Sequence, residues 1–447
     1  MRALLLSVVT SYLFLAPGVS RLLATPVLLV ADSTQDRVVR LEDRNGSGTV
    51  EADVVGEVTV FYDDSSPGPD LSVPSHLAVG SAGQVYLLDG GTVDAVLCLS
   101  DVTGDLDAND DGGEVVVFYD NSNPELPEIF TANTLVAAPD GVFYLSDDGS
   151  AARRVLRFTD LNHDGDASDP GESVVVYDGS ALSSPFLEDI ESLVVMPSGH
   201  LLAGDSTLEG VYSLVDRNDD GNFNGADEVG LFYRGDGETR LSDLDALVVV
   251  DAVVYALSED TGTILWLEDR NGDGDAMGEG EHGVFLDGST TPSVADINDL
   301  VPDGAGGFFL ADGRQDTVYR AIDLNGDRDV LDEKELERYI VGDAGLSTPS
   351  AIVVLPTKAN PGGRLFIRGD ADSSGEIDVS DAIAILGYLF LGEEPGSCLD
   401  ARDVNDNGVV DVTDPVYGLN HQFLGGAPPP PPFPQSGSDP TDDELDC

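Results

Sequence analysis

An acidic loop of one design recurs six times along this 447-residue chain. Residues 269–281 show the design most clearly, since oxygen-bearing side chains occupy alternate positions ahead of a glycine and a closing glutamate. The six loops begin at Asp43, Asp101, Asp160, Asp216, Asp269 and Asp323, so their spacing is nearly constant. A fixed period indicates a repeat protein in which each repeat is one structural unit.

Alternating oxygen side chains in a tight loop predict calcium sites, because calcium takes six to eight oxygen ligands and glycine permits the sharp bend. The loops differ from an EF-hand because no helices flank them and four close at the thirteenth position. Ser47 stands at position five of the first loop, and Leu106 replaces the glycine of the second. Ordinary Asp-rich turns are the alternative, but six copies in register favour calcium. The predicted ligands are Asp43, Asn45, Asp101, Asp105, Asp160, Asn162, Asp164, Glu172, Asp216, Asn218, Asp220, Glu228, Asp269, Asn271, Asp273, Glu281, Asp323, Asn325, Asp327 and Glu335.

Four short β-type runs accompany each repeat, as in the second repeat from His76 to Asp120. Runs of β-branched and aromatic residues bounded by Gly, Asp and Pro predict strands, and four strands per radial unit describe a β-propeller blade. The first repeat lacks one strand, and the missing run stands at Ala351–Pro356. We therefore expect an all-β six-bladed propeller closed by pairing of Val27–Ser33 with Ala351–Pro356. A non-circular stack of β-units gives no reason to divide one unit between the chain ends.

In this arrangement the six acidic loops join third to fourth strands and form a ring on one face. The blade pattern over about Val27–Pro356 resembles calcium-loop-bearing propellers of the NHL and gluconolactonase type. That resemblance implies a single metal in the channel that polarises a lactone carbonyl or activates water. The polar residues expected to face the channel are Ser75, Asn133, Glu191, Asp245, Asn298 and Ser350, of which Asn133, Glu191, Asp245 and Asn298 are the candidate ligand-binding set. A channel that is merely wet and polar is the alternative.

Two further calcium-type loops follow the propeller, at Gly369–Asp381 and Asp403–Asp414. Each precedes an amphipathic helical run, Ala382–Leu391 or Pro415–Leu424. The predicted ligands are Asp370, Asp372, Ser374, Asp378, Asp381, Asp403, Asn405, Asn407, Asp411 and Asp414. The tandem pair of loop–helix units over Arg368–Gly426 resembles a type I dockerin. The resemblance implies a cohesin-like protein partner, contacted near Ser380–Asp381 and Thr413–Asp414. A small calcium-stapled domain that caps the propeller is the alternative.

The ends of the chain suggest export. Residues 1–24 combine an arginine, an apolar run and small residues, which is typical of a secretory signal peptide. We expect the propeller at 25–360, the dockerin-like domain at 361–426 and a Pro-rich acidic tail at 427–447, in a secreted or cell-surface protein. Cys98 is expected to be a buried free thiol. Cys398 and Cys447 could pair in an oxidising compartment.

The net charge of −63 argues against nucleic acid or an anionic membrane as a partner. The sequence contains no Ser–His–Asp signature, GxSxG motif, zinc spacing or phosphate loop. We therefore expect a non-enzymatic binding or extracellular scaffold protein that carries Ca²⁺ and takes a cohesin-like protein or extracellular carbohydrate as partner. The alternative is a metal-dependent lactonase-like or glycan-acting hydrolase with its site in the channel.

Overall fold

The computed structural model describes most of the chain after the predicted signal peptide, which lies outside the described residues together with the first residue of the predicted propeller domain. The described residues are 26–65, 68–80, 83–91, 94–110, 113–148, 153–181, 187–225, 227–235, 237–288, 292–294, 296–355, 366–371, 377–391, 398–406, 408–424, 426, 428–430, 432–433 and 445. Among them, no helix has the length and apolar character needed to cross a membrane.

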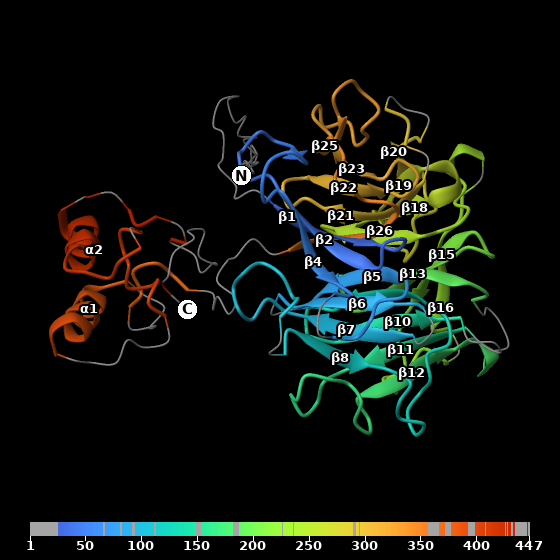
Figure 1. Ribbon diagram of the computed structural model, residues 1–447, viewed down its shortest axis with the longest axis horizontal. Coiled ribbons are helices and arrows are strands. Elements are labelled where there is room, and N and C mark those ends of the chain that lie inside the picture. Colours follow the sequence, from blue (N-terminus) through green and yellow to red (C-terminus); the bar gives the residue numbers. More distant parts are fainter. Residues whose placement is uncertain are drawn as a thin grey trace, which may run out of the picture.

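Six four-stranded antiparallel sheets form the blades of a β-propeller (Figure 1). From the inner to the outer strand, the first blade contains β26 (Pro349–Leu355), β1 (Val27–Asp32), β2 (Arg37–Glu42) and β4 (Val58–Asp63). The second and third contain β5 (Pro74–Val79), β6 (Val85–Asp89), β7 (Ala95–Leu99), β8 (Val115–Tyr119), β9 (Ala132–Ala137), β10 (Phe143–Asp147), β11 (Arg154–Phe158) and β12 (Ser173–Asp178).

The other three blades repeat the same order of strands. The fourth and fifth contain β13 (Ile190–Val195), β14 (Leu201–Asp205), β15 (Gly210–Leu214), β16 (Val229–Tyr233), β17 (Ala246–Val250), β18 (Val253–Ser258), β19 (Thr263–Leu267) and β20 (His282–Leu286). The sixth contains β21 (Ile297–Pro302), β22 (Gly307–Asp312), β23 (Thr317–Ile322) and β24 (Leu336–Arg338). Short 3₁₀ turns occupy Gly179–Ala181, Gly237–Thr239 and Glu259–Thr261. The six-bladed all-β fold predicted from the repeats is therefore confirmed.

The ring closes as predicted from the sequence, because strands from both ends of the propeller sequence form the first blade. β1 pairs antiparallel with β26, with Val27 opposite Leu355 and Val30 opposite Ile352. The six inner strands follow one another around the axis, each beside the inner strand of the next blade. Six clusters of buried apolar side chains fill the spaces between neighbouring blades. The core is thus a ring of inter-blade layers, and β26 completes the last of them.

The outer strand of the sixth blade differs from the predicted continuous run. β24 ends at Arg338, and the chain continues as β25 (Ile340–Val341), which pairs in parallel with β3 (Val50–Glu51) inside the first acidic loop. Tyr339 makes the transition, since its N–H donates to Val318 while its carbonyl accepts from Val50, both at 2.9 Å. The first loop is long enough to carry β3, so it adds a second connection between the sixth and first blades.

Two helices, α1 (Val379–Leu391) and α2 (Thr413–Leu424), pack against each other near the C-terminus (Figure 1). Both begin earlier than predicted. The Asp378 carboxylate accepts the backbone N–H of Ser380 at 2.7 Å, and Asp411 accepts that of Thr413 at 2.6 Å. Such side-chain caps satisfy the free N–H groups of a first helical turn, so the capping aspartates move the helix starts towards the loops.

The three cysteines divide as the sequence suggests. Cys98 is a free thiol on β7, and burial raises its pKa. Its side chain is half-buried rather than fully buried. Cys398 is disulfide-bonded. Cys447, its predicted partner, lies outside the described residues.

Candidate metal centres and channel

Each acidic loop joins the third and fourth strands of its blade, as predicted. The first aspartate organises the loop through backbone N–H groups. Asp269 accepts those of Gly272 at 2.7 Å and Gly274 at 3.0 Å, and Asn271 accepts that of Asp273 at 2.8 Å. Gly274 has φ +96°, which a side chain would strain. The same backbone contacts recur at Asp43, so the loops share one conformation.

The closing glutamate of every loop is buried beneath the loop. Glu281 accepts backbone N–H groups from Arg270 at 3.1 Å, Asn271 at 3.0 Å and Gly278 at 2.8 Å. The equivalent carboxylates, each no more than 2% exposed, are Glu57, Glu114, Glu172, Glu228, Glu281 and Glu335. Glu57 and Glu114 were not predicted as ligands because their loops are slightly longer than the others. The acid immediately before each fourth strand is the sequence signal that identifies them.

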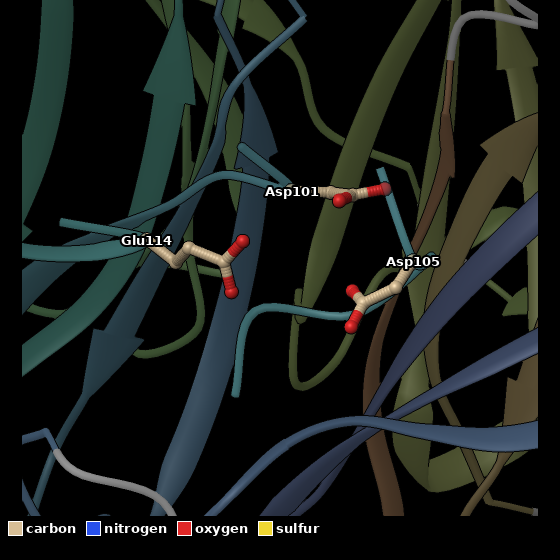
Figure 2. A group of neighbouring side chains, drawn as sticks. All are labelled: Asp101, Asp105 and Glu114. Carbon is tan, nitrogen blue, oxygen red and sulfur yellow. The ribbon is translucent and has the colours of Figure 1, made fainter. Parts of the chain in front are cut away.

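Three loops bring carboxylates into one small space. In the second loop, oxygens of Asp101, Asp105 and Glu114 lie within 4.8 Å of one another, and Figure 2 shows their side chains around a common centre. The third loop gathers Asp164, Asp166 and Glu172, and the fifth gathers Asp273, Asp275 and Glu281. Among the described residues, the other propeller loops do not form such a trio. Asp166 and Asp275, at the seventh position, were not among the predicted ligands.

The charge state of Glu114 bears on what this site can hold. Burial raises its pKa, but backbone hydrogen bonds from Asp110, Thr103 and Val102 outweigh burial and leave the pKa below its ordinary value. Glu114 is therefore ionised at neutral pH, next to two further carboxylates. Three like charges at this separation repel one another unless a cation lies between them. The donors are all hard oxygens, which fit Ca²⁺ better than a soft metal.

The loops also connect neighbouring blades, through a residue that sequence reasoning missed. The eighth residue of each loop donates its backbone N–H to a carbonyl of the preceding blade, at 2.7–2.9 Å. The six bonds are Val50 to Tyr339, Ala108 to Phe61, Ala167 to Phe118, Phe223 to Val176, Ala276 to Phe232 and Val330 to Phe285. All six donors are buried. An apolar residue at the eighth position of every loop is the signal that could have identified this joint.

At the channel, the predicted polar residues coincide with a repeated irregularity of the inner strands. β-bulges fall at Ser75, Asn133, Glu191, Asn298 and Ser350, each of which has no partner in its ladder. A bulge redirects a side chain, as often occurs beside functional sites.

Two of the candidate channel ligands also connect blades. Asn133 donates its amide to Ile190 of the next blade at 3.2 Å, and Asn298 donates to Pro349 at 3.0 Å. Their amide nitrogens are thus engaged in holding the ring together.

The remaining two candidates meet at the channel mouth. Glu191 and Asp245 lie with Asp243 so that oxygens of all three are within 4.8 Å of one another. Burial, Glu259 and then Glu191 and Asp243 raise the pKa of Asp245 to about 9. Such a trio could hold a divalent cation, which would displace the proton from Asp245. Asp243 was not predicted, because it lies outside the polar position that the strand pattern places in the channel.

Next to this trio the channel contains a cavity of about 140 Å³. Burial lowers the pKa of His76 to about 4 and raises that of Asp299 to about 7, and both line the cavity. The His76 ring lies 3.0 Å from the Thr134 hydroxyl. Asp299 accepts backbone N–H groups from Leu300 at 2.8 Å and Ile352 at 2.9 Å. The acidic trio thus gives way to a cavity whose histidine is neutral at physiological pH.

We expect the Asp245→Asn variant to raise the thermal unfolding midpoint at pH 9 in a chelator. The folded chain holds a proton on Asp245 up to about pH 9, whereas the unfolded carboxyl releases it near its ordinary pKa of 3.8. Stability is therefore lost as the pH rises through this window, and the neutral amide avoids that loss. The gain should shrink between pH 9 and pH 5 in differential scanning calorimetry. Asp251→Asn, at an exposed turn, is the matched control, and equal gains at both pH values would contradict the raised pKa.

The two C-terminal loops share one geometry. Asp381 accepts the backbone N–H of Asp378 at 2.8 Å, and Asp414 accepts that of Asp411 at 2.7 Å. Burial, backbone contacts and the nearby Asp403 together leave the pKa of Asp414 raised to about 6. The first and twelfth positions of this loop therefore meet, as a cation site requires. Asn405 donates its amide to Asp414 at 2.7 Å. Asp372, Ser374 and Asn407 lie outside the described residues.

No protein-family model and no curated protein sequence matches the chain. Among solved structures, a chain of a nidogen/laminin complex is similar at 13% identity and TM-score 0.49, over 74% of this chain and 99% of that chain. The periplasmic gluconolactonase of Pseudomonas aeruginosa is similar at 11% identity and TM-score 0.44, over 74% and 99%. A putative 6-phosphogluconolactonase of Bacteroides fragilis is similar at 12% identity and TM-score 0.42, over 76% and 100%. Structural similarity at this level does not assign an activity to this chain.

Proposed function

We propose that this chain is an exported calcium-binding propeller that acts by binding rather than by catalysis. The observation that carries the proposal is the double role of the acidic loops. Each loop holds a buried closing glutamate and, through its eighth residue, joins its blade to the preceding one, and three of the loops gather further carboxylates around that glutamate. A calcium ion in such a loop would fix both ends of the joint. Cation binding to the loops would thus stabilise the contacts between neighbouring blades.

Calcium dependence fits the extracellular location that the predicted signal peptide suggests. Extracellular calcium modules bind at about 0.1–1 mM, so loops of that affinity would be filled outside the cell and largely empty in cytosol. Acidic residues outnumber Lys and Arg by 84 to 21, so the folded chain is favoured by a medium that supplies divalent cations. Without cations, the carboxylates gathered in the loops repel one another in the folded state.

The C-terminal unit supports a docking role. Three exposed apolar residues of its first loop–helix unit, Val379, Ile383 and Phe390, recur in the second unit as Val412, Val416 and Phe423. All six side chains are 51–68% exposed. Repeated apolar residues held outward on both helical units form a surface suited to another protein. We infer that this dockerin-like unit attaches the propeller to a cohesin-like partner.

Calcium loops of the C-terminal unit are expected to stabilise that unit independently of the propeller. Asp370→Ala combined with Asp403→Ala removes a buried first-position carboxylate from each loop. Small domains depend on such staples, so the double variant should lose the C-terminal unit and retain the propeller. Calorimetry of the full chain in calcium should then show one transition removed and the other unchanged. Loss of both transitions would show that the two units are not independent.

A second candidate function rests on the carboxylate trio at the channel mouth. Glu191, Asp243 and Asp245 could hold a metal ion next to the cavity that contains His76 and Asp299. Such an ion would polarise a carbonyl or activate water in a lactonase-like or glycan-acting hydrolase. The test is hydrolysis of simple sugar lactones by the parent protein and by Asp245→Asn. Turnover lost in that variant would favour the enzyme, and equal rates in both would leave only background hydrolysis.

A further inference from the structure

A second cavity lies away from the channel, between the third and fourth blades. It has a volume of about 260 Å³. One wall is the sheet of the third blade, where Tyr144 on β10 stands directly opposite Arg157 on β11. The other wall is the β13–β14 turn with Ser198 and His200, together with the fourth acidic loop at its first residue and Phe223. The backbone bond from Phe223 to Val176 joins the two walls at 2.7 Å.

Arg157 is the unusual member of this cavity. Arginines occupy the same register in two other blades, and each has an acid: Arg40 lies 2.9 Å from Glu42, and Arg320 lies 2.7 Å from Asp303. The residue that corresponds to Glu42 in the third blade is Thr159. Among the described residues, no acidic side chain lies within ion-pair distance of Arg157, although acids outnumber Lys and Arg four to one. A half-buried guanidinium without a carboxylate at ion-pair distance is therefore available to an anionic ligand.

The other lining residues restrict what that ligand can be. The Ser198 hydroxyl lies 3.0 Å from the His200 ring. A hydroxyl and an imidazole each donate and accept hydrogen bonds, so this pair suits the hydroxyl groups of a ligand. Tyr144, Val176 and Phe223 supply an apolar wall. A volume just below the roughly 300–1,000 Å³ of typical ligand sites admits one ring rather than a chain. Asp216, at the start of the fourth loop, lines the same cavity and would repel a ligand that carries a second negative charge.

We propose that this cavity binds a carboxylated sugar, a single uronate ring, with its carboxylate on Arg157 and its hydroxyls on Ser198 and His200. Arginine presents paired N–H donors that match the two oxygens of a carboxylate. The sugar ring lies against Tyr144 and Phe223. One carboxylate supplies a single negative partner for the Arg157 guanidinium. A phosphate dianion carries a second negative charge, which Asp216 and the adjacent loop acids would repel. The site gives the propeller a small-molecule ligand that neither the calcium loops nor the C-terminal unit requires.

The test is isothermal titration of the full chain, in saturating calcium, with sodium D-glucuronate, D-glucose and D-glucose 1-phosphate, a phosphate monoester whose calcium salt is soluble. Glucuronate should bind at least about tenfold more tightly than either of the others, as expected for a charged hydrogen-bonded pair. Arg157→Gln should weaken glucuronate binding about tenfold or more, because the amide removes the charge and the paired donors. Arg320→Gln, at the equivalent position with its own acid, should leave the affinity within about twofold of the parent.

Several results would overturn the proposal. Absence of saturable glucuronate binding would do so, as would equal affinity for glucose or tighter binding of glucose 1-phosphate. Equal affinity in Arg157→Gln would mean that the sugar acid binds elsewhere on the protein and not on this guanidinium. Calcium binding measured on the same samples keeps this result separate from the proposed role of the loops.

Discussion

In a calcium chelator, the thermal unfolding midpoint of the propeller is expected to fall by about 15 °C or more. At a tenfold excess of calcium over the dissociation constant, each occupied site contributes about 1.4 kcal/mol. Six propeller loops would then contribute about 8 kcal/mol, comparable to the roughly 5–15 kcal/mol that stabilises a whole domain. The eighth-position joints weaken as the loops relax, so the loss should appear as separation of blades rather than as fraying of one loop.

Magnesium is the matched control for this experiment. It demands a smaller and stricter octahedral site, so it should restore little of the lost midpoint at equal concentration. Monovalent salt at the same ionic strength controls for screening of the −63 net charge. An unchanged midpoint in chelator would mean that the loops are turns held by their aspartates and closing glutamates alone. Full rescue by salt would assign the effect to general charge repulsion.

Truncation of one buried side chain on the closing strand β26 is expected to destabilise the propeller strongly. Ile352 is 1% exposed on β26, lies opposite Val30 of β1 and packs in the layer between the sixth and first blades. Its replacement by alanine should cost about 2–5 kcal/mol, from lost burial and the cavity that remains. Chemical unfolding followed by tryptophan fluorescence measures the loss. Val341→Ala, at a 49% exposed position of β25, should change stability by no more than about 0.5 kcal/mol, and a similar loss in both variants would contradict the closing role of β26.

Repeat length and strand pattern are sufficient to predict the architecture. The strand missing at the start and present at Ala351–Pro356 predicted the β1–β26 pairing, because a ring leaves no open sheet edge. The prediction failed in detail where contacts between blades compete with the local pattern. LERYIVGD reads as one strand, yet Tyr339 divides it because β25 pairs with β3 from the opposite end of the propeller sequence.

In the candidate sites, too, residues close in sequence were predicted and contacts between different strands or blades were not. Asp101, Asp105 and Asp164 were predictable, since oxygen ligands of one loop are close in sequence. The eighth-position joints, Asp243 beside Glu191, and the unpaired Arg157 were not predicted. Each depends on which residues of another strand or blade lie opposite, and no spacing rule within one loop contains that information. The register of repeats could have indicated Arg157, because Arg40 and Arg320 align with it and have acids nearby.

Anomalous X-ray diffraction from crystals grown in calcium shows whether the propeller loops hold a cation. We expect an anomalous peak in each of the second, third and fifth loops, within ligand distance of the carboxylates of Asp101, Asp164 and Asp273. Each peak should disappear from crystals grown in chelator, with the loop displaced from the preceding blade. If the loops keep one conformation and hold only water in both crystals, calcium does not bind to them.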